Sequence, residues 1–123
     1  IGYVQDTYAR QNKLQTAFIQ NKAGRFVDAN LAEADKAFAG ETFPANFFLV
    51  EGNPTDGYQI VGLTWLLIYK EYPAAKADAI KKMVNWVMTT GQGINKQLEF
   101  TSIPTATAQK VIQTVNQSVV ARG

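Results

Sequence analysis

Neither cysteine nor histidine occurs among the 123 residues of the chain. Without them the protein has no thiol nucleophile, no disulfide, no imidazole base and no cysteine or histidine ligand for zinc. Most hydrolase and metal chemistry is thereby excluded, and we predict a protein that is not an enzyme, with no catalytic residue, no metal site and no cofactor. Because a chain without cysteine suits any redox compartment, this absence does not indicate location.

The chain also has a small net charge and only short apolar runs. Twelve Lys and Arg stand against ten Asp and Glu, which leaves a net charge of +2, and Lys81-Lys82 is the only adjacent basic pair. Nucleic-acid binding normally needs a stronger basic footprint, so we expect no nucleic-acid partner. The longest run of large apolar or aromatic residues, 65–69, is far shorter than the ~20 residues of a membrane span, so we expect no such span.

What the sequence does contain is apolar bulk. Hydrophobic residues make up 46% of the chain and include 7 Phe, 5 Tyr and 2 Trp. This composition and length predict one folded domain at most rather than a disordered segment. The chain begins at Ile1 rather than Met, inside an apolar run and without a signal peptide. We therefore expect it to be the inside of a longer protein.

Strand signals are concentrated in the first seventy residues. We predict a short buried strand over 1–4, a brief helix capped by Asp6, and a hairpin whose turn is 21–24. Apolar runs predict two more strands, over 47–50 and 58–70. The second of these is apolar throughout, which predicts a strand covered on both faces at the centre of a mixed or parallel sheet.

Helix signals dominate the remainder. Asn30 and Glu33 form a capping-box pattern that predicts a helix over 30–39, and Pro73 opens another helix. We expect further helical turns around 94–98 and a final helix over 105–120. The buried stripe expected after Pro73 consists of Ile80, Met83, Val84, Val87 and Met88, and that of the final helix of Ala108, Val111, Ile112, Val115 and Val119. The order of elements predicts an α/β or α+β layered sheet.

No motif in the sequence defines a chemical site. Gly91-Gln92-Gly93 lacks the context of a phosphate-binding loop and reads as a helix stop, and no two carboxylates are marked as a catalytic pair. Ser102 is expected to cap the final helix, although helix starts also attract anions. Thr55 and Asp56 can bond either their own backbone or a ligand, and Trp65 and Tyr69 are expected in the core.

A series of short motifs runs through nearly the whole chain in a familiar order. They are Ile1-Gly2-Tyr3-Val4 with Tyr8-Ala9, Gln11-Asn12-Lys13-Leu14, the long run from Ile60 to Lys70, Asn85-Trp86, Gly91-Gln92, Leu98, Ile103-Pro104, Val111 and Val115-Asn116. This ordered set resembles the C-terminal part of the PstS family, the phosphate-binding protein of the bacterial phosphate ABC transporter.

The resemblance implies the C-terminal portion of a two-lobed periplasmic-binding-protein fold, an α/β structure with a mixed sheet and flanking helices. Residues 1–58 would belong to the second lobe, and 59–123 would supply a hinge strand and helices that return toward the first. Gly52 and Gly57 are then hinge candidates. The family holds phosphate with backbone amides, hydroxyls, an Arg beside Ser-Gly-Thr, and an Asp. No Ser-Gly-Thr occurs here, so no residue carries over as a phosphate ligand, and the ligands are expected upstream.

The same resemblance implies the partners and the location. The partners would be inorganic phosphate bound through the complete protein, the upstream N-terminal half, and the phosphate ABC permease, and the location would be periplasmic or cell-surface. The alternative is an autonomous or self-associating structural or interaction module without phosphate affinity. The mass of the natural product separates the two, because a receptor of two domains is about 35 kDa.

Overall fold

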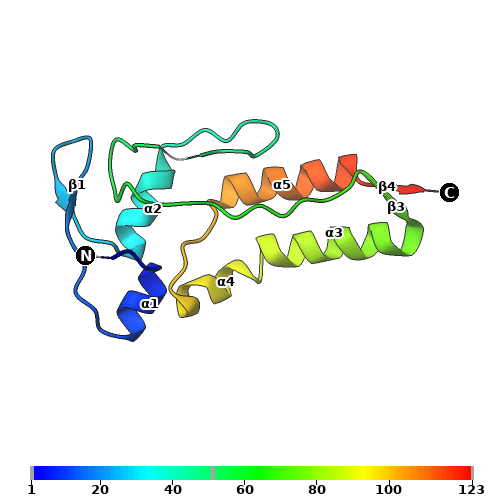
Figure 1. Ribbon diagram of the computed structural model, residues 1–123. Coiled ribbons are helices and arrows are strands. Elements are labelled where there is room, and N and C mark those ends of the chain that lie inside the picture. The colour runs from blue at the N-terminus through cyan, green and yellow to red at the C-terminus, as the bar shows by residue number, and fades with distance from the viewer. Residues whose placement is uncertain (1, 51, 123) are drawn as a thin grey trace. The chain divides into compact units, whose positions relative to one another are not determined.

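The computed structural model describes residues 2–50 and 52–122 and contains both helices and strands, as the sequence predicts (Figure 1). The helices are α1 (Asp6–Gln11), α2 (Leu31–Ala39), α3 (Ala74–Met88), α4 (Gln92–Asn95), the 3-10 turn η1 (Lys96–Leu98) and α5 (Thr105–Ser118). The strands are β1 (Ile19–Gln20), β2 (Phe26–Val27), β3 (Glu71–Pro73) and β4 (Val120–Arg122). The chain divides into two compact units, the first formed up to Leu63 together with Asn95–Thr101, and the second by Thr64–Ile94 and the residues from Ser102 onward.

The first unit contains the predicted hairpin and the predicted capped helix. Strands β1 and β2 pair antiparallel, with Ile19 opposite Val27. Helix α2 begins after Asn30, whose side chain accepts a hydrogen bond from the backbone N–H of Glu33 at 2.9 Å, and it ends at the C-cap Gly40. Both predictions are confirmed. Each depends on residues that are close together in sequence, so local signals are sufficient to predict it.

Helix α1 is present where the sequence predicts it, but Asp6 is not its cap. The N-cap position is Gln5, and no side chain caps the helix there. Asp6 lies in the first turn and pairs with Arg10, one turn along the helix, at 2.7 Å. An acidic residue in the first turn still favours the helix through the macrodipole.

The second unit is built on two helices and one strand pair. Helices α3 and α5 pack side by side (Figure 1), and β3 pairs parallel with β4, so that Tyr72 lies opposite Ala121. Tyr72, Ala77 and Val119 form a buried cluster, against which Ile68, Ile80 and Val115 pack. The core therefore joins both helices to the strand pair.

Helix α3 follows Pro73 as predicted, although its apolar stripe is narrower than the sequence indicates. Val84 is only 3% exposed, whereas Met83 is 39% exposed. The expectation that Met83 is buried is therefore wrong. Adjacent helical residues point about 100° apart, so the face that meets α5 holds Val84 and turns Met83 toward its margin.

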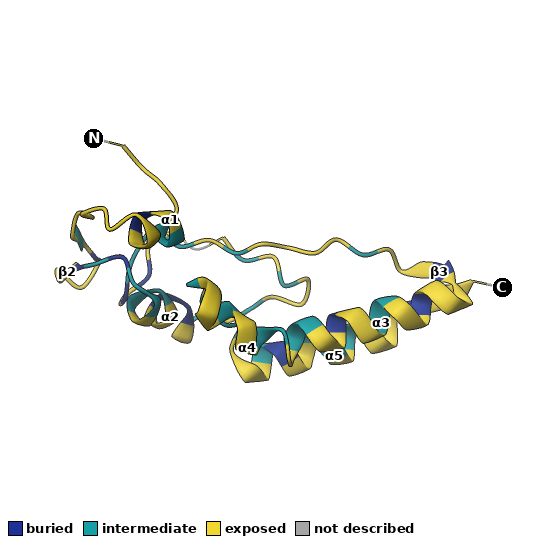
Figure 2. Cartoon of the chain, turned by 90° about the horizontal axis from the view of Figure 1, so that it is seen from below, coloured by how far each residue is buried: buried dark blue, intermediate teal, exposed yellow. Residues whose placement is uncertain are grey.

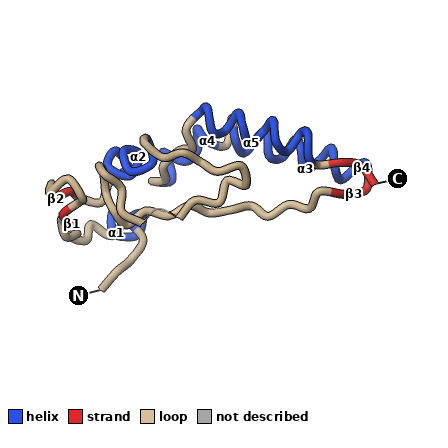
Figure 3. Tube along the Cα trace, turned by 90° about the horizontal axis from the view of Figure 1, so that it is seen from above, coloured by secondary structure: helices blue, strands red, loops and turns tan. Residues whose placement is uncertain are grey.

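The predicted strands over 1–4, 47–50 and 58–70 are not formed by the described residues (Figure 3). Residues 2–4 are exposed and irregular, and Ile1 lies outside the described residues. A strand is stabilised by hydrogen bonds to a neighbouring strand, and the strand pairs of the described residues, β1 with β2 and β3 with β4, lie outside these segments. The apolar runs are present without the sheet that they predict.

The residues before β3 lie mostly at the surface (Figure 2). Trp65 is 40% exposed and Tyr69 is 80% exposed, so the prediction that both belong to the core is wrong. Tyr69 contacts Tyr72 edge-to-face, with 6.1 Å between the ring centroids. Among the described residues, no helix has the length and apolar character needed to cross a membrane.

Candidate functional site

The loop over 52–57 holds both hinge candidates, in different surroundings. Gly52 is exposed, and a Cβ atom added there would meet nothing within 4 Å. Gly57 is buried with φ near +80°, and an added Cβ would lie 2.2 Å from the backbone oxygen of Glu33. Left-handed backbone and this close approach to α2 both require glycine at position 57.

A network of side chains fastens the end of this loop, and we call it the loop anchor: Asn21, Arg25, Glu33, Asp56 and Gly57. Asn21 is only 4% exposed, and its amide nitrogen donates to the Gly57 carbonyl at 3.3 Å. Its amide oxygen accepts the Arg25 backbone N–H at 3.0 Å. The anchor thereby joins the hairpin turn to the loop.

The same loop end is joined to helix α2. The N–H of Tyr58 donates to the Glu33 backbone oxygen at 3.0 Å, and the N–H of Gly57 donates to the Asp56 carboxylate at 2.8 Å. The first of these bonds holds the backbone next to Gly57 against the helix, and the second is made within the loop. In the sequence, Asn21 is recognisable only as a turn residue, since nothing local signals that its side chain is buried by a loop more than thirty residues away.

Charge reinforces the loop anchor. The Arg25 guanidinium pairs with Asp56 and, at 3.3 Å, with Glu33, which also pairs with Lys36 at 2.6 Å. The hydrogen bond from Arg25 and then that from the Gly57 N–H hold the pKa of Asp56 below its ordinary value. The Asp56 bond raises the pKa of Arg25 in turn. Asp56 therefore bonds within its own loop and to Arg25, which is the first of the two roles that the sequence leaves open.

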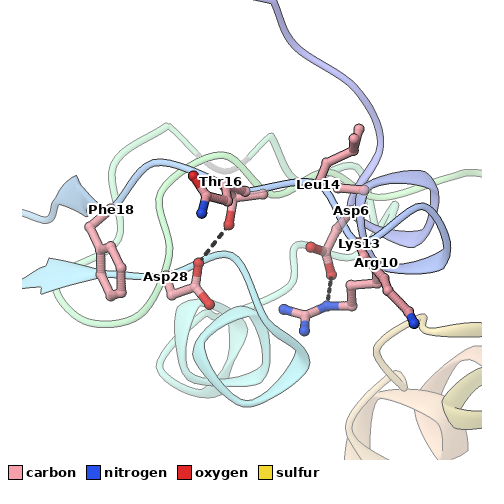
Figure 4. Close-up of a pocket in the computed structure, with 9 residues that line it drawn as sticks. Asp6, Arg10, Lys13, Leu14, Thr16, Phe18 and Asp28 are labelled. Atoms are coloured by element: carbon pink, nitrogen blue, oxygen red, sulfur yellow. Dashed lines mark hydrogen bonds and ion pairs between the residues drawn. The ribbon is translucent and has the colours of Figure 1, made fainter.

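A hollow of about 580 Å³ lies beside α1, and Figure 4 shows the side chains around it. Its lining combines both signs of charge: Asp6, Ala9, Arg10, Lys13, Leu14, Gln15, Thr16, Phe18 and Asp28. Within it, the Thr16 hydroxyl donates to the Asp28 carboxylate at 2.8 Å. The two carboxylates offset the two cations, so the hollow does not present the concentrated positive charge that would attract an anion.

The guanidinium of Arg10 already has partners. It pairs with Asp6 through Nε, and through its terminal nitrogen it donates to the Ala29 carbonyl. The hydrogen bond to Asp6 raises the pKa of Arg10, and partial burial opposes the rise. The other carboxylate oxygen of Asp6, Oδ1, is buried without a hydrogen-bond partner among the described residues. The hollow therefore does not supply the convergent free donors that an anion requires.

Every arginine of the chain is ion-paired. Besides Arg10 and Arg25, Arg122 lies with Nε 3.7 Å from the Glu71 carboxylate. An arginine that is paired with a carboxylate attracts a dissolved anion less strongly, because the carboxylate repels the anion. No group of three acidic residues suited to a metal ion occurs among the described residues.

The start of helix α5 differs from the sequence prediction. The N-cap position is Pro104, and Ser102 does not cap the helix. The Ser102 hydroxyl instead donates to the Gln92 backbone oxygen at 3.2 Å, and the Gln92 side chain accepts the Ile103 N–H at 2.8 Å. The Ser-Ile-Pro segment is thus held by α4 rather than by its own helix. The prediction that Ser102 is an N-cap is wrong.

Several proteins similar to this chain carry the name phosphate-binding protein PstS. The one from Methanocaldococcus jannaschii is 32% identical over 116 residues, covering 75% of this chain and 28% of the relative. That of Pasteurella multocida is 26% identical over 116 residues, covering 90% and 34%. That of Xylella fastidiosa is 32% identical over 110 residues, covering 85% and 30%. No protein-family model matches the chain, and no solved structure matches it significantly.

These relatives share a class, that of binding proteins. More particularly, the chain is related to one part of the PstS phosphate-binding proteins, which confirms the resemblance predicted from the ordered motifs. It spans between 28% and 34% of the length of these relatives. The mixture of helices and small sheets agrees with the predicted α/β class.

Proposed function

We propose that this chain is part of a substrate-binding protein that captures inorganic phosphate for uptake by an ABC permease, outside the cytoplasm and without catalysis. The observation that carries the proposal is the similarity to several proteins named phosphate-binding protein PstS over 75–90% of the chain. The relatives are named for binding, so a non-catalytic role is the simplest one for the chain to share.

The chain itself is proposed to lack the phosphate ligands. Capturing a phosphate ion requires several convergent donors to replace its hydration shell. The arginines of this chain are all paired with carboxylates, and the hollow beside α1 carries both signs of charge. The donors would be supplied by an upstream N-terminal half, and these residues would provide a supporting scaffold.

We also propose that residues 1–58 belong to one lobe and that 59–123 return toward the other, with Gly52 and Gly57 at the ends of the connecting loop. The loop anchor bears on how such a hinge would work. Because Gly57 is held against α2 and Gly52 has open surroundings, closure torsions would fall nearer Gly52.

A calorimetric phosphate titration tests the proposal. The longer polypeptide encoded together with these residues is compared with the 123 residues alone in the same buffer. We expect tight binding by the longer protein and weak or no binding by the 123 residues. The matched control is sulfate, an anion of similar size that differs in protonation.

Two outcomes contradict the proposal. A longer protein that binds no phosphate would remove the transport role and favour a structural or interaction module. Sub-micromolar phosphate binding by the 123 residues alone would show that they carry the ligands themselves. Variants of Ser102 and of the loop anchor would then locate the site.

A further inference from the structure

The last turn of α5 contains a sequence motif that phosphate capture does not explain. Asparagine followed two residues later by serine or threonine is the acceptor for N-linked glycans, provided that the middle residue is not proline. The chain has two such tripeptides, Asn53-Pro54-Thr55 and Asn116-Gln117-Ser118. Because Pro54 occupies the middle position of the first, only the motif at 116–118 is competent.

The competent motif lies on a polar side of α5. All three residues of 116–118 are exposed. One and two turns before Asn116, the same side of the helix carries the exposed amides Gln113 and Gln109. Val115 packs against the core cluster of the second unit from another side of the helix. A stripe of amides is typical of a helix face that stays in water, so this face has room for a bulky hydrophilic group.

The position of the motif at the end of α5 makes it accessible to a modifying enzyme. Within a helix, residues two positions apart point about 200° away from each other, so Asn116 and Ser118 cannot enter one enzyme site together until the turn opens. Helix α5 ends at Ser118, and β4 follows closely (Figure 1). The last turn of a helix has unsatisfied carbonyl groups and opens at little cost in free energy. Opening of this turn presents the motif as extended backbone while the rest of α5 stays folded.

We propose that Asn116 carries an N-linked glycan, transferred from an oligosaccharide that is joined to a lipid through phosphate. A bond forms between Nδ2 of Asn116 and the anomeric carbon of the first sugar, while the bond from that carbon to the phosphate oxygen breaks. The lipid phosphate leaves with the electron pair of the broken bond, and the amide releases one proton, so the transfer needs neither an oxidant nor a reductant. This inference rests on the proposed function only for the location outside the cytoplasm.

Tandem mass spectrometry tests the proposal on the complete protein, isolated from the cells that produce it naturally. We expect the peptide that contains Asn116 to carry the mass of a glycan. Asn53 is the matched internal control, because it is exposed too and differs in the proline that follows it, so its peptide should be unmodified. An unmodified Asn116 in protein recovered from outside the cytoplasm would overturn the proposal. Equal modification of both asparagines would also overturn it, since the motif would then have no part in the reaction.

A pair of variants, produced in the same cells, gives an independent measurement. Ser118→Ala keeps Asn116 but removes the hydroxyl that the motif requires, so we expect the glycan to be lost. Ser118→Thr preserves the motif and should keep the glycan. Both substitutions change an exposed residue, so neither should unfold the protein. A glycan that persists in Ser118→Ala would overturn the proposal. Because the readout is a mass and not phosphate affinity, a failure here is distinguishable from a failure of phosphate binding.

Discussion

Gly52 and Gly57 share one loop but tolerate a side chain very differently. At Gly57 a methyl group would collide with the backbone of α2 and would require a left-handed conformation. We expect Gly57→Ala to lower the free energy of unfolding by about 1–3 kcal/mol, the usual cost of overpacking. Gly52→Ala, with open surroundings, should be nearly neutral. Urea denaturation of the two variants measures the difference, and equal losses would contradict the close packing at Gly57.

The loop anchor should loosen in acid through Asp56. Because the folded state holds the pKa of Asp56 below its ordinary value, ionised Asp56 stabilises the fold at any pH above that ordinary value. The contribution is lost as the pH falls through the lowered pKa. We expect the Gly57 amide resonance to shift over this acid range, and to lose that dependence in Asp56→Asn. A Gly57 resonance that is constant with pH in the parent protein would contradict the anchor.

The packing of α3 can be tested with two adjacent positions. Val84 is 3% exposed and Met83 is 39% exposed. Val84→Asp would bury an unpaired carboxylate, so we expect a loss of stability on the order of 3 kcal/mol or more. Met83→Asp can keep its charge in water and should cost markedly less. Thermal melts of both variants decide the matter, and equal losses would show that the buried face of α3 is assigned wrongly.

Helices could be predicted from the sequence because their signals are local. Asn30 caps α2 through a residue three positions away, and Pro73 starts α3 next to its own apolar stripe. The hairpin was predictable for the same reason, since its turn joins the two strands directly. The run over 58–70 has the composition of a strand, yet pairing depends on a neighbour, and no local pattern can supply one.

The candidate site was less predictable than the helices. The two hinge glycines are visible in the sequence, but the sequence does not distinguish them. Their difference arises from contacts with α2 and with Asn21, which lies more than thirty residues from the loop. The ion pair of Arg25 with Asp56 cannot be predicted from the sequence, because the partner is remote along the chain. The ion pair of Arg10 with Asp6 can be predicted, because the two residues lie one helical turn apart.

At the scale of the whole chain, exposed apolar segments should make the isolated 123 residues associate with one another. Leu67 and Tyr69 are available for pairing between copies when no other strand covers them. We expect light scattering to rise with protein concentration. Leu67→Lys should reduce the rise, and Gln109→Lys should not. A monomer at every concentration that melts sharply would contradict this expectation and favour an autonomous domain.

The parallel pairing of β3 with β4 has a consequence for biosynthesis. The ribosome produces Glu71 well before its partner Val120, with helices α3 and α5 made in between. Throughout that interval the nascent chain displays β3 and the apolar residues before it without their sheet partner. Hairpin β1–β2 and helix α2 can form as they emerge, since their contacts are local. The second unit cannot complete its strand pair until β4 has been synthesised. Until then, chaperones that bind extended apolar peptides would bind β3 and the apolar residues before it.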